Sequence, residues 1–220
     1  MGAVYMHMGE YSKALSFHEK ALEIYEKTLP SNHPSLATSY SNIGAVYMHM
    51  GKYSKVLSFY EKALEIYQKT LPSNHPDLAT SYSNIGMVHM NMGEYSKALS
   101  FHEKALEIYK KTLPSNHPDL ATSYNNIGAV YYNMEEYSRA LSFYEKSLEI
   151  KQKTLPSNHP SLATSYNNIG MASYSTMDYS KALTYFERTL DIWQRTLPAN
   201  HPHIKTVKQS IEICKGSIKK

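Results

Sequence analysis

The sequence predicts an all-α solenoid, a stack of helix pairs that repeats with a period of 42 residues. A Leu-Pro-(Ser/Ala)-Asn-His-Pro segment recurs at this spacing, beginning at Leu29, Leu71, Leu113, Leu155 and Leu197. The units between these segments are near copies, since residues 77–118 and 119–160 match at 32 of 42 positions. Each unit also carries apolar residues at helical spacing. A fixed period of roughly 20–50 residues is typical of solenoids and repeat arrays.

The first helix of each unit, here called helix A, follows the proline of the linker. Pro34 suits the first helical position, because its missing N–H would have no partner there. The helix is expected to run to about Met50, with Gly51 at the turn. In two other units an aspartate follows the proline, and Asp119 is one of these residues. The negative charge of an aspartate suits the positive end of a helix.

The second helix, here called helix B, carries an apolar stripe with i, i+3, i+4, i+7 spacing. In the unit after Pro34 this stripe is Tyr53, Val56, Leu57, Tyr60, Ala63, Leu64 and Tyr67. Glu65 and Lys69 are four residues apart and are expected to pair on the outer face. Pro72 ends the helix, because the residue before a proline avoids the α conformation.

Small residues recur at positions where two helices must approach closely. Three sets of residues at equivalent positions of successive units, here called columns, are small: Gly2, Gly44, Gly86, Gly128 and Gly170; Ala14, Val56, Ala98, Ala140 and Ala182; Ala21, Ala63, Ala105, Ser147 and Thr189. Large residues alternate with them, namely Tyr5, Tyr47, His89 and Tyr131, and then Phe17, Phe59, Phe101 and Phe143. We expect large side chains of one helix to pack against small ones of its neighbour.

These columns resemble the tetratricopeptide repeat (TPR). The motif positions are Tyr124, Ile127-Gly128, Tyr131, Ala140, Tyr144 and a diverged Ser147. The 42-residue form is similar to the repeats of kinesin light chain, as shown by His117-Pro118-Asp119, Asn125-Asn126 and Ala105-Leu106-Glu107-Ile108. The resemblance covers residues 1–202 and implies a right-handed TPR solenoid.

The expected organisation is a repeat array over residues 1–202, with a partial repeat at 1–34 and full repeats at 35–76, 77–118, 119–160 and 161–202. Met1 and Gly2 match the Ile and Gly columns, so the sequence begins inside a helix A. We therefore expect the C-terminal part of a longer array, or a truncated gene prediction, whose first helix B exposes apolar surface. Residues 203–220 are expected to form a capping helix with a basic tail, because Lys208 and Glu212 replace packing residues. This end is expected to be the true one.

Composition argues against several classes of protein. The whole net charge of +4 arises in residues 203–220, because the rest of the chain has 18 basic and 18 acidic groups. It lacks the basic stripe of a nucleic-acid-binding protein. No apolar run approaches the roughly 18 residues of a membrane helix, and no signal peptide is recognised. Cys214 is the only cysteine, which fits a reducing compartment, so a cytoplasmic location is predicted.

The sequence favours neither catalysis nor metal binding. It contains no Gly-rich phosphate loop, nucleophile elbow or paired carboxylates. The His-Pro-Asp tripeptide resembles the catalytic tripeptide of J-domain cochaperones, but it becomes His-Pro-Ser at His33 and His159 and lies in a linker. Five of the eleven histidines are linker residues 42 positions apart, whereas zinc ligands usually follow a His-x₃₋₅-His spacing. His7 and His49 share a column, but neighbouring helices place them roughly 8–10 Å or more apart. We expect no cofactor, no metal and no enzymatic activity.

By the same resemblance, helices A line a concave groove. The predicted binding residues are two polar columns, Ser41, Ser83, Asn125 and Asn167, and Asn42, Asn84, Asn126 and Asn168, with an apolar column, Met48, Met90, Tyr132 and Tyr174. Beside them lie Thr38, Thr80, Thr122 and Thr164; Ala45, Met87, Ala129 and Met171; and His49, Asn91, Asn133 and Ser175. An asparagine is both donor and acceptor, so a ladder of them can pair with a peptide backbone of any sequence. The Met/Tyr column offers adaptable apolar contact.

For both kinds of column an alternative to ligand binding stays open. In this alternative the asparagines fasten neighbouring repeats together, and the Met/Tyr column packs inside the array. The six columns contain no Lys or Arg. This argues against the carboxylate clamp with which other TPR proteins bind chaperone tails, and against the acidic-peptide specificity of kinesin light chain.

The predicted function is a non-catalytic scaffold or adaptor that binds a protein or an extended peptide, and neither nucleic acid nor a membrane. One alternative is the C-terminal regulatory or recruiting array of a larger protein, an enzyme among the options, that is truncated at residue 1. The other is a structural array that self-associates through its uncovered N-terminal helix.

Overall fold

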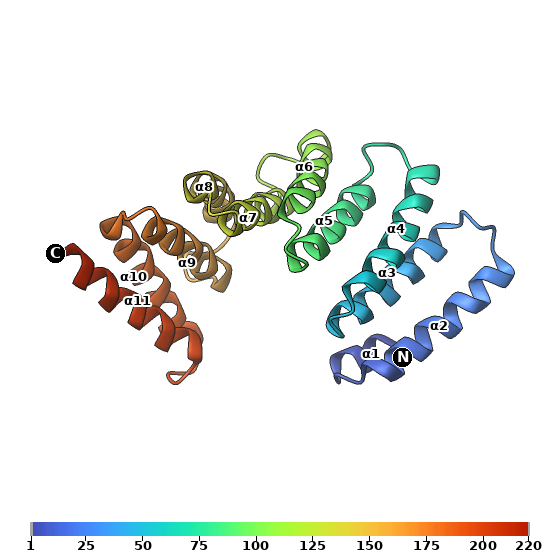
Figure 1. Cartoon of the computed structure of the whole chain (residues 1–220), viewed down its shortest axis with the longest axis horizontal. Helices are drawn as coiled ribbons and strands as arrows, with labels where there is room; N and C mark the ends of the chain where they lie inside the picture. Colours follow the sequence, from blue (N-terminus) through green and yellow to red (C-terminus); the bar gives the residue numbers. More distant parts are fainter. Residues whose placement is uncertain (1, 220) are drawn as a thin grey trace. The chain divides into compact units, whose positions relative to one another are not determined.

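The computed structural model describes residues 2–219, which form eleven α-helices and no strand (Figure 1). Helices of the A type are α1 (Gly2–His7), α3 (Pro34–His49), α5 (Pro76–Asn91), α7 (Pro118–Asn133), α9 (Pro160–Ser175) and α11 (Pro202–Ile218). Helices of the B type are α2 (Tyr11–Thr28), α4 (Tyr53–Thr70), α6 (Tyr95–Thr112), α8 (Tyr137–Thr154) and α10 (Tyr179–Thr196). The predicted all-α fold is confirmed. Met1, matched to the isoleucine column, and Lys220, in the predicted tail, lie outside the described residues.

The helices form two compact units, Met1–Thr112 with α1 to α6 and Leu113–Lys220 with α7 to α11. Within each unit, every helix packs against the next one along the chain. Each full-length helix A of α3, α5, α7 and α9 makes its more extensive contact with the helix B that follows it, so the helix pair is the packing unit. Across residues 2–219, no helix combines the length and the apolar character needed to cross a membrane.

The linkers start each helix A with a histidine cap. The Nδ1 atoms of the five linker histidines accept a hydrogen bond from the backbone N–H two residues ahead, at 3.1–3.2 Å; these residues are His33, His75, His117, His159 and His201. The bond satisfies one of the donors that a helix start leaves unpaired. The following proline occupies the first turn, as the sequence predicts. The histidine is therefore a structural residue, a role that sequence reasoning did not assign.

The turn from helix A to helix B places one residue in the left-handed region. In the first unit these residues are glycines, with φ of +67° at Gly51 and +76° at Gly93. In the second unit Glu135 and Met177 take the same position with φ of 63°. A side chain there costs about 1 kcal/mol, so the turn is maintained by the packing of the helices that it joins.

The glycine column allows an aromatic ring of helix B to lie against the backbone of helix A. A Cβ atom built on Gly44 would lie 2.5 Å from the Tyr60 ring, and one on Gly128 would lie 2.7 Å from Tyr144. A Cβ atom built on Gly86 would collide with the His102 ring in the same way, and one on Gly170 would collide with the Phe186 ring. The predicted packing of large against small residues is confirmed. The large partners of the glycines, however, are the helix B residues Tyr60, His102, Tyr144 and Phe186.

The large residues named from the sequence pack against one another instead. Tyr47 stacks on Phe59 with ring centroids 5.6 Å apart, and Tyr131 stacks on Phe143 at 5.5 Å. The predicted outer-face ion pair is also present, with Lys69 Nζ 2.6 Å from Glu65 Oε1. Both of its side chains are well exposed, so it adds little to stability.

Helix α11 closes the second unit with two different faces. Ile204, Val207, Ile211 and Cys214 are buried against the preceding helices. Lys208 and Glu212 are exposed. Ile213 and Ile218 are exposed as well, at 53% and 46%, so the open side of α11 is less polar than the sequence predicts.

His102 is a buried side chain without a hydrogen-bond partner. It is 1% exposed, and neither ring nitrogen has a partner among the described residues. Burial lowers its pKa to about 4, so the folded protein keeps the ring neutral at pH values where the unfolded chain binds a proton. The equivalent positions hold Tyr60, Tyr144 and Phe186, which shows that the site accepts a larger ring.

Exchange of two glycines tests the close approach of the helices. Gly128→Ala is expected to lower the thermal midpoint by several degrees, because its methyl group collides with the Tyr144 ring. Gly216→Ala in α11 is the control: nothing lies within 4 Å of its Cβ position, and alanine is the better helix former, so the midpoint should rise slightly. Circular dichroism during heating measures both. An equal response of the two variants would contradict the packing described.

Replacement of His102 tests its buried ring. His102→Phe is expected to raise the thermal midpoint at pH 7 by about 2–4 °C, because it removes two unpaired buried nitrogens. The pKa of His102 is lower in the folded protein than in the unfolded chain. Its contribution to the free energy of unfolding is therefore fully present above about pH 6.5 and is lost as the pH falls to about 4. The loss is on the order of 3 kcal/mol in the wild type and is absent in the variant. Thermal unfolding from pH 7 to pH 4 measures it; parallel curves would refute this account.

Candidate binding surface

The twelve predicted binding residues all lie on helices of the A type. They are carried by α3, α5, α7 and α9, and none of them is fully buried. Asn42 and Tyr174 are exposed, and the other ten are partly exposed. Each of these helices therefore leaves one side, here called the helix-A face, open between its surfaces that pack on helices B.

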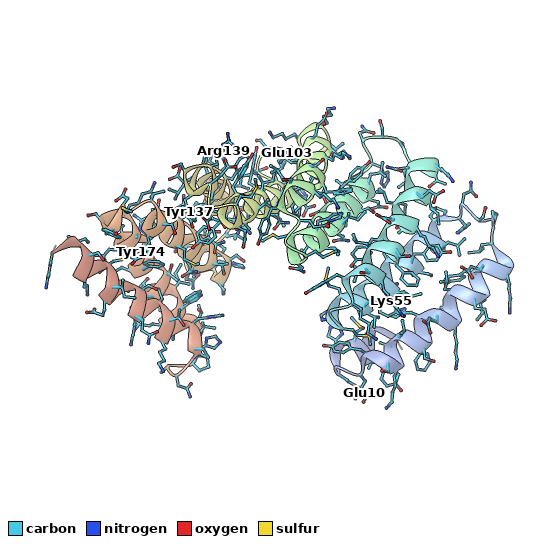
Figure 2. All side chains as sticks on the ribbon, viewed as in Figure 1. Glu10, Lys55, Glu103, Tyr137, Arg139 and Tyr174 are labelled. Carbon is cyan, nitrogen blue, oxygen red and sulfur yellow. The ribbon has the colours of Figure 1, made fainter. Side chains whose placement is uncertain are left out.

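In the second unit the helix-A face contains an apolar hollow of about 200 Å³. Its lining residues come from four helices and are Tyr132, Met171, Tyr174, Phe186, Ser210 and Ile213. Tyr132 and Tyr174 belong to the predicted Met/Tyr column, and Met171 to the column beside it. Figure 2 labels Tyr174 on α9. None of the six side chains carries a charge.

In the second unit, the first tyrosine of helix B packs against the tyrosine of the Met/Tyr column. The Tyr174 and Tyr179 rings lie 5.3 Å apart, and so do the Tyr132 and Tyr137 rings. Tyr174 is nevertheless 39% exposed. The Met/Tyr column thus combines packing with an open surface, and the two interpretations left open by the sequence hold together here.

The asparagines fall into two groups. Asn168 Nδ2 donates to Asn125 Oδ1 at 3.1 Å, which joins two adjacent repeats. This bond supports the fastening role for these two residues. By contrast, the side chains of Asn42, Asn84 and Asn126 make no hydrogen bond to another described residue, and they remain accessible. Their amide groups are open to a ligand.

The threonine column links helix A to its own helix B. Thr80 Oγ1 lies 3.0 Å from the Tyr109 hydroxyl, and it also bonds the carbonyl of Pro76 at 3.2 Å. Thr38 and Tyr67 make the equivalent, longer contact at 3.4 Å. These threonines have a structural role in the first unit.

Three lining residues were missed from the sequence: Phe186 on α10, and two on α11, Ser210 and Ile213. The latter two occupy the asparagine column and the Ala/Met column in α11, each 42 residues after Asn168 and Met171. The columns continued one unit further predict both residues, whereas the charged residues of α11 predict a solvated helix. Lys205 and Lys208 line a neighbouring hollow that shares Ile213. Within residues 2–219, no three His, Cys, Asp or Glu side chains come together as metal ligands do.

Comparison with known proteins agrees with the geometry. The sequence matches the tetratricopeptide repeat family at residues 1–69, 77–153 and 140–195. No curated protein sequence matches it. Among solved structures, it is similar to a kinesin light chain-like protein of Podosopora anserina with nearly identical TPR-like repeats. A substituted variant of that protein is 28% identical with a TM-score of 0.78, covering 89% of this chain and 92% of that one. The other structure of it is 26% identical, with a TM-score of 0.77 and coverage of 90% and 94%.

A third similar structure is BtubC (BKLC) of P. vanneervenii, which is 23% identical with a TM-score of 0.77 and covers 99% of this chain and 85% of that one. This last likeness is one of fold alone. The helix pairs, the 42-residue period and the match over most of the sequence agree: the chain belongs to the tetratricopeptide repeat family, and it is similar to a kinesin light chain-like protein of that family.

Proposed function

We propose that the chain is a non-catalytic scaffold or adaptor that binds a protein or an extended peptide on its helix-A face. The apolar hollow lined by Tyr132, Met171 and Tyr174 is the observation that carries this proposal. Concave sites lined by apolar side chains with a few polar groups are the usual form of ligand sites in proteins. The TPR fold is typical of protein-interaction scaffolds, which supports the same conclusion.

The chemistry of the face defines the ligand. A hollow of about 200 Å³ suits one large apolar side chain of a peptide. The half-exposed amide of Asn126, unpaired with any described residue, can donate to and accept from the backbone beside it. Because the lining has no charge, recognition rests on shape and backbone pairing. We therefore propose an uncharged, apolar segment as the ligand.

Location and context belong to the same proposal. The only cysteine is the buried Cys214, which suits the reducing environment of the cytoplasm. If the chain is the recruiting array of a larger protein, the helix-A face has the same task there. The self-stacking alternative is less well supported at α11, because the face that would meet a following helix B carries Lys205, Lys208 and Glu212.

The hollow can be tested with one substitution and a neighbouring control. Peptides selected on the chain from a displayed library are expected to lose at least about tenfold in affinity when Tyr174 is replaced by alanine, because the wall of the hollow is removed. Met177→Ala, three residues further and 74% exposed in the turn, should leave affinity unchanged. Isothermal titration gives both values. Selected peptides that bind the two variants equally would place recognition elsewhere.

The two groups of asparagines give a second test. Asn84→Ala combined with Asn126→Ala is expected to weaken peptide binding while the thermal midpoint changes by less than about 2 °C, because neither side chain bonds a described residue. Asn125→Ala is the comparison, since it breaks the bond to Asn168 and should lower stability by about 1 kcal/mol. Loss of stability in the double variant equal to its loss of binding would favour the fastening role for all asparagines.

A further inference from the structure

The hollow of the second unit has a counterpart in the first unit with different side chains. Four residues that line the hollow are Tyr132, Met171, Tyr174 and Phe186. The residues at the same repeat positions two repeats earlier are Met48 on α3, Met87 and Met90 on α5, and His102 on α6. An imidazole and two further thioethers therefore take the place of three aromatic rings.

The His102 ring lies against the part of α5 that carries the methionines. A Cβ atom built on Gly86 would lie 2.9 Å from Cε1 and 3.0 Å from each nitrogen of this ring. The part of the ring that holds both nitrogens therefore lies against α5. Met87 follows Gly86 directly, and Met90 lies one helical turn after Gly86 on the same side of the helix.

The second unit shows that this arrangement brings such side chains together. Phe186 lies against the glycine of α9 as His102 lies against Gly86. Tyr174 comes one turn after that glycine, as Met90 comes one turn after Gly86. Phe186 and Tyr174 line the same hollow. Because the repeats are near copies, His102 and Met90 are expected to face one space as well.

Met48 reaches α5 from the preceding helix A. Its Sδ atom lies 3.6 Å from Nδ2 of Asn91, the residue after Met90. Met48 and Met90 stand at the same position of adjacent repeats, and the two tyrosines at this position in the second unit line one hollow. Met48 and Met90 are partly exposed and Met87 is 44% exposed, so a solute has access to the thioethers.

The unpaired imidazole of His102 is an independent sign of a ligand. The side chain is 1% exposed, and neither ring nitrogen has a hydrogen-bond partner among the described residues. A buried polar group without a partner is rare in folded proteins, and a bound ion is one of the groups that can supply the missing contact. The ring is also neutral at pH 7, which is the form that coordinates metals.

The four side chains form a donor set for a soft metal ion. Thioether sulfur is a soft ligand that selects Cu⁺, and imidazole suits copper as well. The set contains no carboxylate, which argues against Mg²⁺, Ca²⁺ and Mn²⁺. It also differs from the Cys- and His-rich sets that hold structural zinc.

We propose that Met48, Met87, Met90 and His102 bind one Cu⁺ ion, with three thioethers and one imidazole nitrogen as ligands. All four residues belong to the first unit and come from α3, α5 and α6. The metal pairs a nitrogen that the folded chain otherwise leaves without a partner. This site does not include the hollow of the second unit, and it is independent of the peptide binding proposed there.

Magnetic resonance of the full chain with isotope-labelled methionine methyl groups tests the site. Cu⁺ alone, kept reduced with ascorbate in the absence of oxygen, is titrated into the protein. The methyl signals of Met48, Met87 and Met90 are expected to shift and to saturate, because their sulfur atoms become ligands. Met92 at the end of α5 and Met177 in the second unit, which are 39% and 74% exposed, are the internal controls and should not shift. Zn²⁺ should shift none of the five signals.

Substitutions test each kind of ligand. His102→Phe keeps a ring of the kind that Phe186 places at this position, but it removes the nitrogen. The affinity for Cu⁺, measured by competition with a coloured chelator, is expected to fall by about tenfold or more. Met87→Leu removes a sulfur at nearly constant volume and should weaken binding similarly. Met92→Leu is the matched control, and it should bind Cu⁺ as the wild type does.

Several results would overturn the proposal. They are unchanged methyl signals of Met87 and Met90 at excess Cu⁺, an equal shift of the Met177 signal, and wild-type affinity in His102→Phe. Cys214→Ala removes the only thiol of the chain, so loss of binding in this variant would assign the metal to the cysteine and contradict the proposal as well. Circular dichroism verifies that each variant is folded, and Met87→Leu decides the question if His102→Phe is not.

Discussion

The structure depends on the contact between an aromatic ring of helix B and the glycine backbone of helix A. At Gly44, Gly128 and Gly170 the ring occupies the space in which a Cβ atom would lie. This contact fixes how closely the two helices of a pair approach. The distance in turn decides which residues of helix A remain outside the pair and form the open face. A feature of the core thus determines the geometry of the helix-A face.

The same contact recurs in each helix pair with a different ring-bearing side chain. Tyr60, His102, Tyr144 and Phe186 fill one position in four pairs, and the helices around them keep the same bounds relative to the repeat. Shape is therefore the requirement, and polarity is secondary. His102 satisfies the shape but leaves two nitrogens unpaired, and burial lowers its pKa to about 4. The array tolerates such a residue because the stability of a repeat protein is spread over many similar interfaces.

The fold could be predicted from the sequence in most of its parts, because a strict period, proline-marked starts and an apolar stripe each depend on local rules. The bounds of α3, for instance, follow from Pro34 and Gly51. Pairing across helices could not be predicted in the same way. The partner of the glycine column and the bond between Asn125 and Asn168 depend on how two helices are rotated against each other, which spacing along one helix does not determine. The contribution of α11 to the hollow was not predicted, although Ser210 and Ile213 continue two columns. The charged residues of this helix predict a solvated surface instead.

The histidine caps have a consequence for the protons of the linkers. A ring that accepts at Nδ1 holds its proton on Nε2, so the backbone N–H at each helix start selects one tautomer in five of the eleven histidines. The same neutral imidazole N–H therefore recurs every 42 residues. The tautomer of each linker histidine is thus coupled to the backbone of the helix that follows it.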